Sequence, residues 1–170
     1  MATTYKLISS ITVGATAVAS VEFTSIPQTY TDLVVLLSGR SDTVRSSDGG
    51  YAMISFNGST ANLSSRYLYN YNGSSFSGSG TNILGWNVPS DYTANTFGNN
   101  SWYIPNYASS NNKSVSLDTV TENNSGNILM GITAGLFSSA SAITSVKISN
   151  EAAAKFVQHT TAYLYGISNA

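Results

Sequence analysis

The chain has 170 residues, of which 42% are hydrophobic and only 9% are charged, and its formal net charge is −1. This balance excludes a nucleic-acid site built on clustered cations, because such a site needs several Lys and Arg side chains to displace counterions from phosphates. The chain has no cysteine, which excludes disulfides, thiolate metal ligands and a cysteine nucleophile.

The first residues only partly resemble a targeting segment. LISSITVGATAVA after Lys6 has part of the character of a signal peptide, but its Ser, Thr and Gly residues interrupt the apolar run. No stretch approaches the ~18 apolar residues of a membrane span, and no basic amphipathic segment suggests binding to a membrane surface. We therefore expect no signal peptide and no membrane partner. A chain of this length is expected to form one domain, residues 1–170.

Short segments in which apolar and polar side chains alternate predict β-strands along most of the chain. In chain order they are residues 4–8, 17–23, 30–39, 51–56, 64–71, 113–120, 128–134, 143–149 and 161–167, with shorter pieces at 96–97 and 102–104. Asn57-Gly58 predicts a two-residue hairpin turn between 51–56 and 64–71, because both positions tolerate positive φ. Residues 73–82, which are rich in Gly and Ser, are predicted as a flexible loop.

Helical patterns are almost absent. Glu151 and Lys155 are spaced i and i+4 in the one short helical pattern, which could equally be a turn. Parallel sheets would need crossover helices, for which the chain has no room. The sequence therefore predicts an all-β fold, an antiparallel β-sandwich of jelly-roll type with eight to ten strands. Residues 1–13 are expected to form an N-terminal arm or an edge strand.

Two predicted strands are apolar on both faces, whereas strands of an antiparallel sandwich normally have one polar face. They lie within residues 33–37 and 128–132. Monomers seldom leave large apolar patches exposed, so we expect these side chains either to close the core or to be buried between copies of the chain in a homo-oligomer. The residues of this predicted oligomer or core-closure face are Leu33, Val34, Val35, Leu36, Leu37, Ile128, Met130 and Ile132.

Tyrosine is unusually frequent, with 11 residues in the chain. In YLYNYNG the tyrosines at 67, 69 and 71 are two apart and therefore share one face of a strand. Beside an Asn-rich loop, such rings could stack against sugars while amides bind the sugar hydroxyls. They could equally pack as a ladder on a neighbouring strand or subunit. The candidate glycan-stacking residues are Tyr67, Tyr69, Tyr71 and Trp86.

Catalytic and metal-binding patterns are sparse, and we expect no catalytic residue, metal or cofactor. His159 is the only histidine and has no G-x-S-x-G partner motif, so we interpret it as a loop or strand-edge residue. RSDTVRSSDGG gathers Arg40, Asp42, Arg45 and Asp48 without the spacing of a calcium loop. We interpret this segment as a solvated loop with exposed ion pairs.

Four stretches, YKLISSITV, SIPQTYTDLVVLLSGRSD, YAMISFNG and TTAYLYGI, together resemble small virion structural proteins of tailed bacteriophages, especially marine and cyanobacterial phages. ANTFGNNSWYIPNYASSNNKS and SAITSVKI fit the same pattern. The resemblance implies a non-enzymatic jelly-roll domain on the virion, either a capsid decoration or cement protein or a part of the tail. It implies a homotrimer and the major capsid protein as partners, and it brings no active-site residues.

Two further functions remain open from the sequence. A tail-fibre or receptor-binding domain would recognise host-surface glycans through the tyrosine stripe. A small carbohydrate-active enzyme would need two carboxylates about 5–9 Å apart in a cleft. The position of the tyrosines and of the scattered carboxylates distinguishes these functions.

Overall fold

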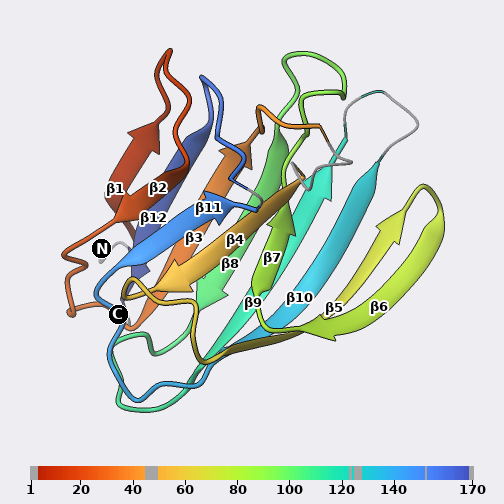
Figure 1. Cartoon of the computed structure of the whole chain (residues 1–170). Helices are drawn as coiled ribbons and strands as arrows, with labels where there is room; N and C mark the ends of the chain where they lie inside the picture. The colour runs from red at the N-terminus through yellow and green to blue at the C-terminus, as the bar shows by residue number, and fades with distance from the viewer. Residues whose placement is uncertain (1–3, 45–49, 123, 125–127, 152, 169–170) are drawn as a thin grey trace.

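The computed structural model describes residues 4–44, 50–122, 124, 128–151 and 153–168. They form two antiparallel sheets packed as a sandwich (Figure 1), which confirms the predicted fold class. The large sheet contains, in spatial order, β1 (Tyr5–Thr12), β12 (Thr161–Ile167), β3 (Asp32–Gly39), β8 (Gly98–Ile104), β9 (Lys113–Thr121), β10 (Leu129–Phe137), β5 (Leu63–Tyr71) and β6 (Ser74–Gly80). The small sheet contains β2 (Ser20–Phe23), β11 (Val146–Asn150), β4 (Tyr51–Phe56) and β7 (Ile83–Trp86).

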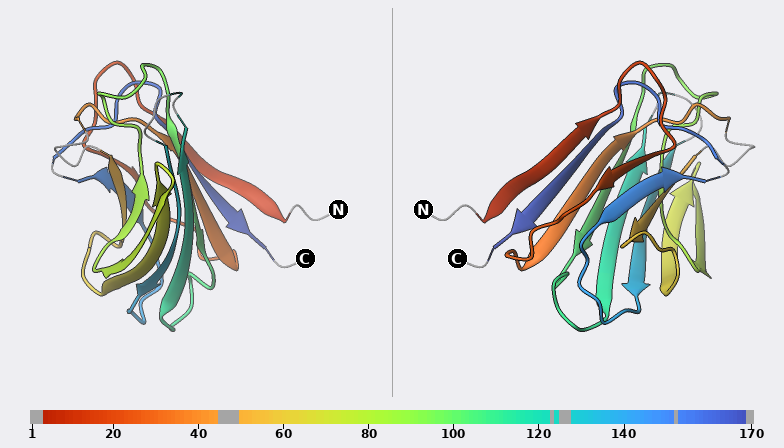
Figure 2. Two further views of the ribbon diagram at one scale, coloured as in Figure 1. Left: turned by 90° about the vertical axis from the view of Figure 1, so that its right-hand side faces the viewer. Right: turned by 60° about the vertical axis from the view of Figure 1, so that its left-hand side comes forward.

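The chain crosses repeatedly between the sheets in the order of a jelly roll. β1, β3, β8 and β12 lie in the large sheet, while β2, β4, β7 and β11 lie in the small one. β9, β10, β5 and β6 then extend the large sheet on the side of β8, beyond the small sheet's edge strand β7 (Figure 1). The large sheet is therefore only partly covered by its partner. β1 and β12 form its opposite edge, with both ends of the chain beside each other (Figure 2).

Two strands were not predicted. Residues 74–80 form β6 and residues 83–86 form β7. The predicted loop at 73–82 is wrong because Asn72 and Gly73, with φ of 50° and 83°, make a tight turn that folds β6 back on β5. Glycine on β6 also leaves room for bulky neighbours, since a Cβ at Gly78 would overlap the ring of Tyr67.

The predicted hairpin at Asn57-Gly58 is also wrong. The two residues have the expected positive φ, 53° and 71°, but β4 belongs to the small sheet and β5 to the large one. The Asn57 side chain explains the difference, because it donates to the carbonyl oxygen of Ala142 and accepts from the backbone N–H of Thr144. These bonds hold the turn against the segment before β11 while the chain crosses to the other sheet.

The short helical pattern at 151–155 forms a turn. The backbone N–H of Ala154 donates to the carbonyl oxygen of Glu151 at 3.1 Å. Ala153 has a φ of 61°, which lies outside the right-handed helical region. At the start of the chain, Tyr5–Thr12 is the edge strand β1, paired with β12, and residues 1–3 lie outside the described residues.

The core lies between the two sheets. Leu33, Val35 and Leu37 on β3 are fully buried, and they face the small sheet, where Ile54 and Phe56 on β4 are buried as well. Burying side chains of this size stabilises the fold by about 1.5–3 kcal/mol each. Leu33, Val35 and Leu37, which belong to the predicted oligomer or core-closure face, therefore close the core.

Arg40 contradicts the interpretation of residues 40–50 as a solvated loop. It follows β3 and is 9% exposed. Its guanidinium donates to carbonyl oxygens of the segment after β7, and burial lowers its pKa against the opposing effect of the Asp91 carboxylate. The acceptors are the carbonyls of Ser90, Tyr92, Thr93 and Thr96. Asp42 is exposed as expected, whereas Arg45 and Asp48 lie outside the described residues.

Candidate functional site

The large sheet has a face turned away from the small sheet, here called the outer face. On β10 the side chains alternate, so that Leu129 and Phe137 are buried while Met130 and Ile132 are 54% and 60% exposed. All of the exposed large apolar side chains among the described residues lie on this face except Val44 and Phe76. They are Tyr5, Leu7, Leu68, Tyr103, Val120, Met130, Ile132, Leu136 and Tyr163. Nine of the eleven exposed large apolar side chains of the described residues therefore share one face of the large sheet.

One part of the outer face, the β10 patch, consists of Leu68, Val120, Met130, Ile132 and Leu136. Ile132 lies opposite Leu68 on β5, and Met130 lies opposite Val120 on β9. A shallow hollow of about 320 Å³ lies between Leu68, Met130 and Ile132. Met130 and Ile132 therefore do not close the core, and their predicted role in a subunit contact stays a prediction.

The other part of the outer face is here called the tyrosine patch, and it lies on β1, β12, β3 and β8. It consists of Tyr5, Leu7, Tyr103, Tyr163 and Tyr165. Val34 is in register between Tyr103 and Tyr165, and it is only 8% exposed. Leu36, opposite Tyr163, is half-buried. Neighbouring tyrosines of the same chain therefore shield Val34 and partly shield Leu36, and the predicted role of these two residues in an oligomer contact stays a prediction.

A charged hydrogen bond fixes one ring of the tyrosine patch. The Tyr103 hydroxyl donates to Oδ2 of Asp32 at 2.7 Å, and Oδ1 of the same carboxylate accepts from the backbone N–H of Asn106 at 2.8 Å. The bond to Asp32 and, to a smaller extent, burial raise the pKa of Tyr103 to about 12. The tyrosine therefore stays neutral well into the alkaline range.

Tyr103, with its pKa raised to about 12, is expected to ionise only in the strongly alkaline range, and Asp32→Asn is expected to lower this pKa toward the ordinary value of about 10. Because the folded-state pKa is raised, the bond's contribution to stability is complete below about pH 10 and is lost as the pH rises toward about 12. Absorbance titration of phenolate, compared with Tyr103→Phe, measures this. An unchanged titration curve in Asp32→Asn would contradict the assignment.

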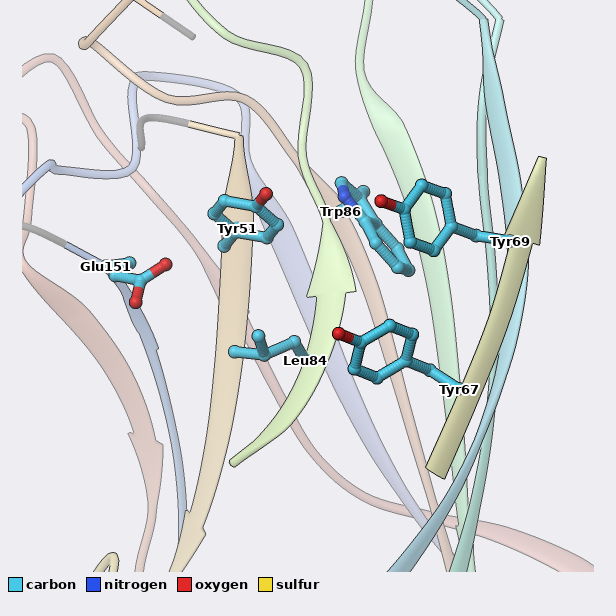
Figure 3. Close-up of a pocket in the computed structure, with 6 residues that line it drawn as sticks. All are labelled: Tyr51, Tyr67, Tyr69, Leu84, Trp86 and Glu151. Carbon is cyan, nitrogen blue, oxygen red and sulfur yellow. The ribbon is translucent and has the colours of Figure 1, made fainter. Parts of the chain in front are cut away.

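A pocket of about 250 Å³ lies where β5 reaches past the edge strand β7, and it is called the aromatic pocket (Figure 3). Its lining residues come from β4, β5, β7 and the end of β11. They are Tyr51, Tyr67, Tyr69, Leu84, Trp86 and Glu151. Tyr67 and Tyr69 extend from one side of the pocket, and Glu151 lies on the other (Figure 3).

The rings of the aromatic pocket pack against one another. The ring centroids of Tyr69 and Trp86 are 5.1 Å apart, and those of Tyr51 and Trp86 are 6.1 Å apart. Tyr69 also stacks on Phe76 of β6 at 5.2 Å, and Tyr67 lies 5.9 Å from Tyr69. Aromatic pairs at these spacings attract beyond their buried area, so the wall of the pocket is preformed.

The backbone of Trp86 is held by the large sheet through a side chain. Asn100 on β8, which is fully buried, donates from Nδ2 to the carbonyl oxygen of Trp86 at 2.9 Å, and its Oδ1 accepts from the Trp86 N–H at 2.9 Å. The Thr119 hydroxyl accepts from the same N–H at 3.0 Å. A Cβ on Gly85 would overlap the Asn100 amide, so glycine is needed there.

Three of the four candidate glycan-stacking residues meet in the aromatic pocket. Tyr67, Tyr69 and Trp86 line it, whereas Tyr71 does not. Sequence reasoning missed Tyr51, Leu84 and Glu151, and no local pattern links these residues to the tyrosine stripe. Among the described residues, the carboxylate of Glu151 and no amide side chain line the pocket.

The remaining candidates stand apart from both surfaces. His159 is exposed in a turn with a φ of 71°, which agrees with its interpretation as a loop residue. The described residues hold no group of three or more His, Cys, Asp or Glu side chains that could bind a metal ion. None of the described residues forms a helix that is long and apolar enough to cross a membrane.

Comparison of the chain with protein-family models, curated proteins and solved structures finds no match.

Proposed function

We propose that this chain is a non-enzymatic structural protein of a tailed-phage virion, and specifically a capsid decoration or cement protein that binds the shell of the major capsid protein. The observation that carries the proposal is the outer face, on which nearly all exposed large apolar side chains of the described residues gather. The sequence resemblance to small virion proteins supports the same function.

The proposal assigns the β10 patch to contacts between copies of this chain. Its aliphatic side chains suit the core of a subunit interface, which is depleted of charge. In a ring closed about a three-fold axis, every copy uses the same contact and each contact can be modest, because several copies bind the shell at once. The low charge of the chain, 9%, is compatible with such an assembly.

The tyrosine patch is assigned to the capsid shell. Tyr5 and Leu7 on β1 are about half exposed, at 54% and 49%, at the edge of the large sheet where both ends of the chain emerge (Figure 2). Tyrosine and leucine together offer apolar area with a hydroxyl for hydrogen bonding, a combination that is enriched at protein interfaces. The same edge would lie on the capsid floor in this arrangement.

The purified chain is expected to have the mass of a trimer in solution, and Ile132→Asp is expected to shift it to a monomer. A charge at this 60% exposed position costs the folded monomer little, but it would be buried unpaired in the proposed interface. Sedimentation or light scattering at micromolar concentration measures the mass, and co-sedimentation with shells of the major capsid protein measures uptake.

Val44→Asp is the matched control, because Val44 is 40% exposed and lies outside the outer face. This variant is expected to remain a trimer and to bind shells. A wild-type chain that is monomeric at micromolar concentration and is not taken up by shells would contradict the proposed function.

The second candidate is a tail-fibre or receptor-binding domain that recognises host-surface glycans. It is favoured by the meeting of Tyr67, Tyr69 and Trp86 in the aromatic pocket. A ring face there could stack on a sugar. Comparing the binding of N-acetylglucosamine with that of choline tests this function directly.

A further inference from the structure

Among the described residues, four aromatic side chains and one charged side chain, that of Glu151, line the aromatic pocket. We propose that it binds a small organic cation, namely a quaternary or methylated ammonium group. The proposal is independent of the virion function, because it depends on the contents of the pocket and not on the outer face.

The rings provide the first part of the argument. A cation within about 6 Å of the centre of a Trp or Tyr ring is attracted to the negative face of its π system, and Trp is the strongest of these partners. Trp86 lies in contact with Tyr69 and Tyr51, with ring centroids 5.1 Å and 6.1 Å away. A methylated ammonium group seated beside Trp86 would therefore be within reach of several rings at once.

The charge of the pocket provides the second part. Glu151 is the one charged residue among the described residues that line the pocket, and it lies on the opposite side of the pocket from Tyr67 and Tyr69 (Figure 3). Among the described residues, no Lys or Arg side chain lines the same space. Apolar and aromatic walls lower the local dielectric constant, which strengthens the attraction between a carboxylate and a bound cation. The pocket is therefore complementary to a positive charge.

The size and polar groups of the pocket decide between a cation and a sugar. A volume of about 250 Å³ is below the ~300–1,000 Å³ of sites that enclose drug-sized ligands, so the pocket suits one headgroup. Sugar recognition usually adds amide or charged groups that bind several hydroxyls, and none of the described residues that line this pocket is Asn or Gln. A trimethylated ammonium group needs no hydrogen-bond partner.

The pocket is also fixed before any ligand arrives. Asn100 and Thr119 hold the Trp86 backbone at 2.9–3.0 Å, while Phe76 stacks on Tyr69. Side chains that are already ordered lose little conformational entropy when a ligand binds. This rigidity favours recognition of a small group that offers little contact area.

The test compares choline with its uncharged isostere, in which a tert-butyl group replaces the trimethylammonium group. The two probes match in shape and differ in charge. Trp86 lines the pocket, whereas the chain's other tryptophan, Trp102, is fully buried in the core, so a saturable change in tryptophan emission reports the pocket. Choline is expected to bind at least tenfold more tightly than the isostere.

Two variants locate the site. Glu151→Gln keeps the shape of the side chain, and it is expected to weaken choline binding about tenfold without changing the affinity for the isostere. Tyr67→Leu removes a half-buried ring and is expected to weaken choline binding by a similar factor. Tyr163→Leu on the outer face is the control, and its affinity for choline is expected to equal that of the unmodified chain. Thermal unfolding verifies that each variant is folded.

Any of four results would overturn the inference. The isostere could bind as tightly as choline, choline could fail to saturate, or Glu151→Gln could leave the affinity for choline unchanged. Tighter binding of N-acetylglucosamine than of choline would also overturn it, and would support the glycan-binding function instead. None of these results bears on the trimer and shell-binding tests, so the two proposals fail separately.

Discussion

Replacing Arg40 with Met is expected to lower the free energy of unfolding by about 2–4 kcal/mol, because the loss of several hydrogen bonds from a charged donor is only partly offset by sparing the desolvation cost of a buried guanidinium. The guanidinium binds four backbone carbonyls in the segment after β7. Methionine can fill the same space but donates nothing. Arg40→Lys is expected to fall between the two, since an ammonium group cannot span acceptors that a planar guanidinium reaches.

Chemical denaturation measures this effect through the shift of the unfolding midpoint at constant slope. Arg66→Met is the matched control, because Arg66 is exposed and its guanidinium bonds to the carbonyl of the adjacent Ser65. This variant is expected to change the stability by no more than about 0.5 kcal/mol. Equal stabilities for the two variants would show that the buried guanidinium does not hold the segment in place.

Replacing Asn100 with Ala is expected to lower the free energy of unfolding by about 2–3 kcal/mol, because the carbonyl oxygen of Trp86 loses its donor in a buried environment. The Asn100 amide bonds to both backbone groups of Trp86 and accepts from the Thr119 hydroxyl at 2.8 Å. Without it, β7 is held less firmly against the large sheet. The aromatic pocket is then expected to loosen as well, and choline affinity to fall.

Denaturation and tryptophan emission together measure the two effects of Asn100→Ala. Asn99→Ala provides the control, because Asn99 is the neighbouring residue on β8 and its side chain is exposed on the opposite face. It is expected to leave both the stability and the emission spectrum unchanged. If Asn100→Ala were as stable as Asn99→Ala, the hydrogen bonds of the Asn100 amide between the sheets would not contribute to the free energy of unfolding.

The strands could be predicted where alternation was regular. Tyr51–Phe56 and Thr161–Ile167 match the predicted bounds in full. The predictions failed where the side chains were small, as on β6, because glycine and serine carry no apolar signal. The partner of each strand was also beyond local patterns: the turn at Asn57 has the expected conformation, but long-range bonds to residues 142–145 decide which sheet the chain enters next.

The residues of the sites could be predicted where they lie on one strand, but not where sheet pairing brings separate strands together. The common face of Tyr67 and Tyr69 follows from their spacing of two, and both line the pocket. Tyr51 and Glu151, a hundred positions apart in the chain, come together because β4 pairs with β11. The shielding of Val34 likewise depends on which residues β8 and β12 place beside it. Such cross-strand neighbours are set by sheet pairing, which one sequence does not reveal.

The meeting of the two chain ends has a practical consequence. The backbone N–H of Ser168 donates to the carbonyl oxygen of Thr4 at 3.1 Å, so the first and last described residues lie together at one corner of the β1–β12 edge. β5, which supplies Tyr67 and Tyr69, lies near the other edge of the same sheet. A passenger protein fused at either end would therefore be carried far from the aromatic pocket, and the sandwich could serve as a display platform whose binding cavity stays accessible.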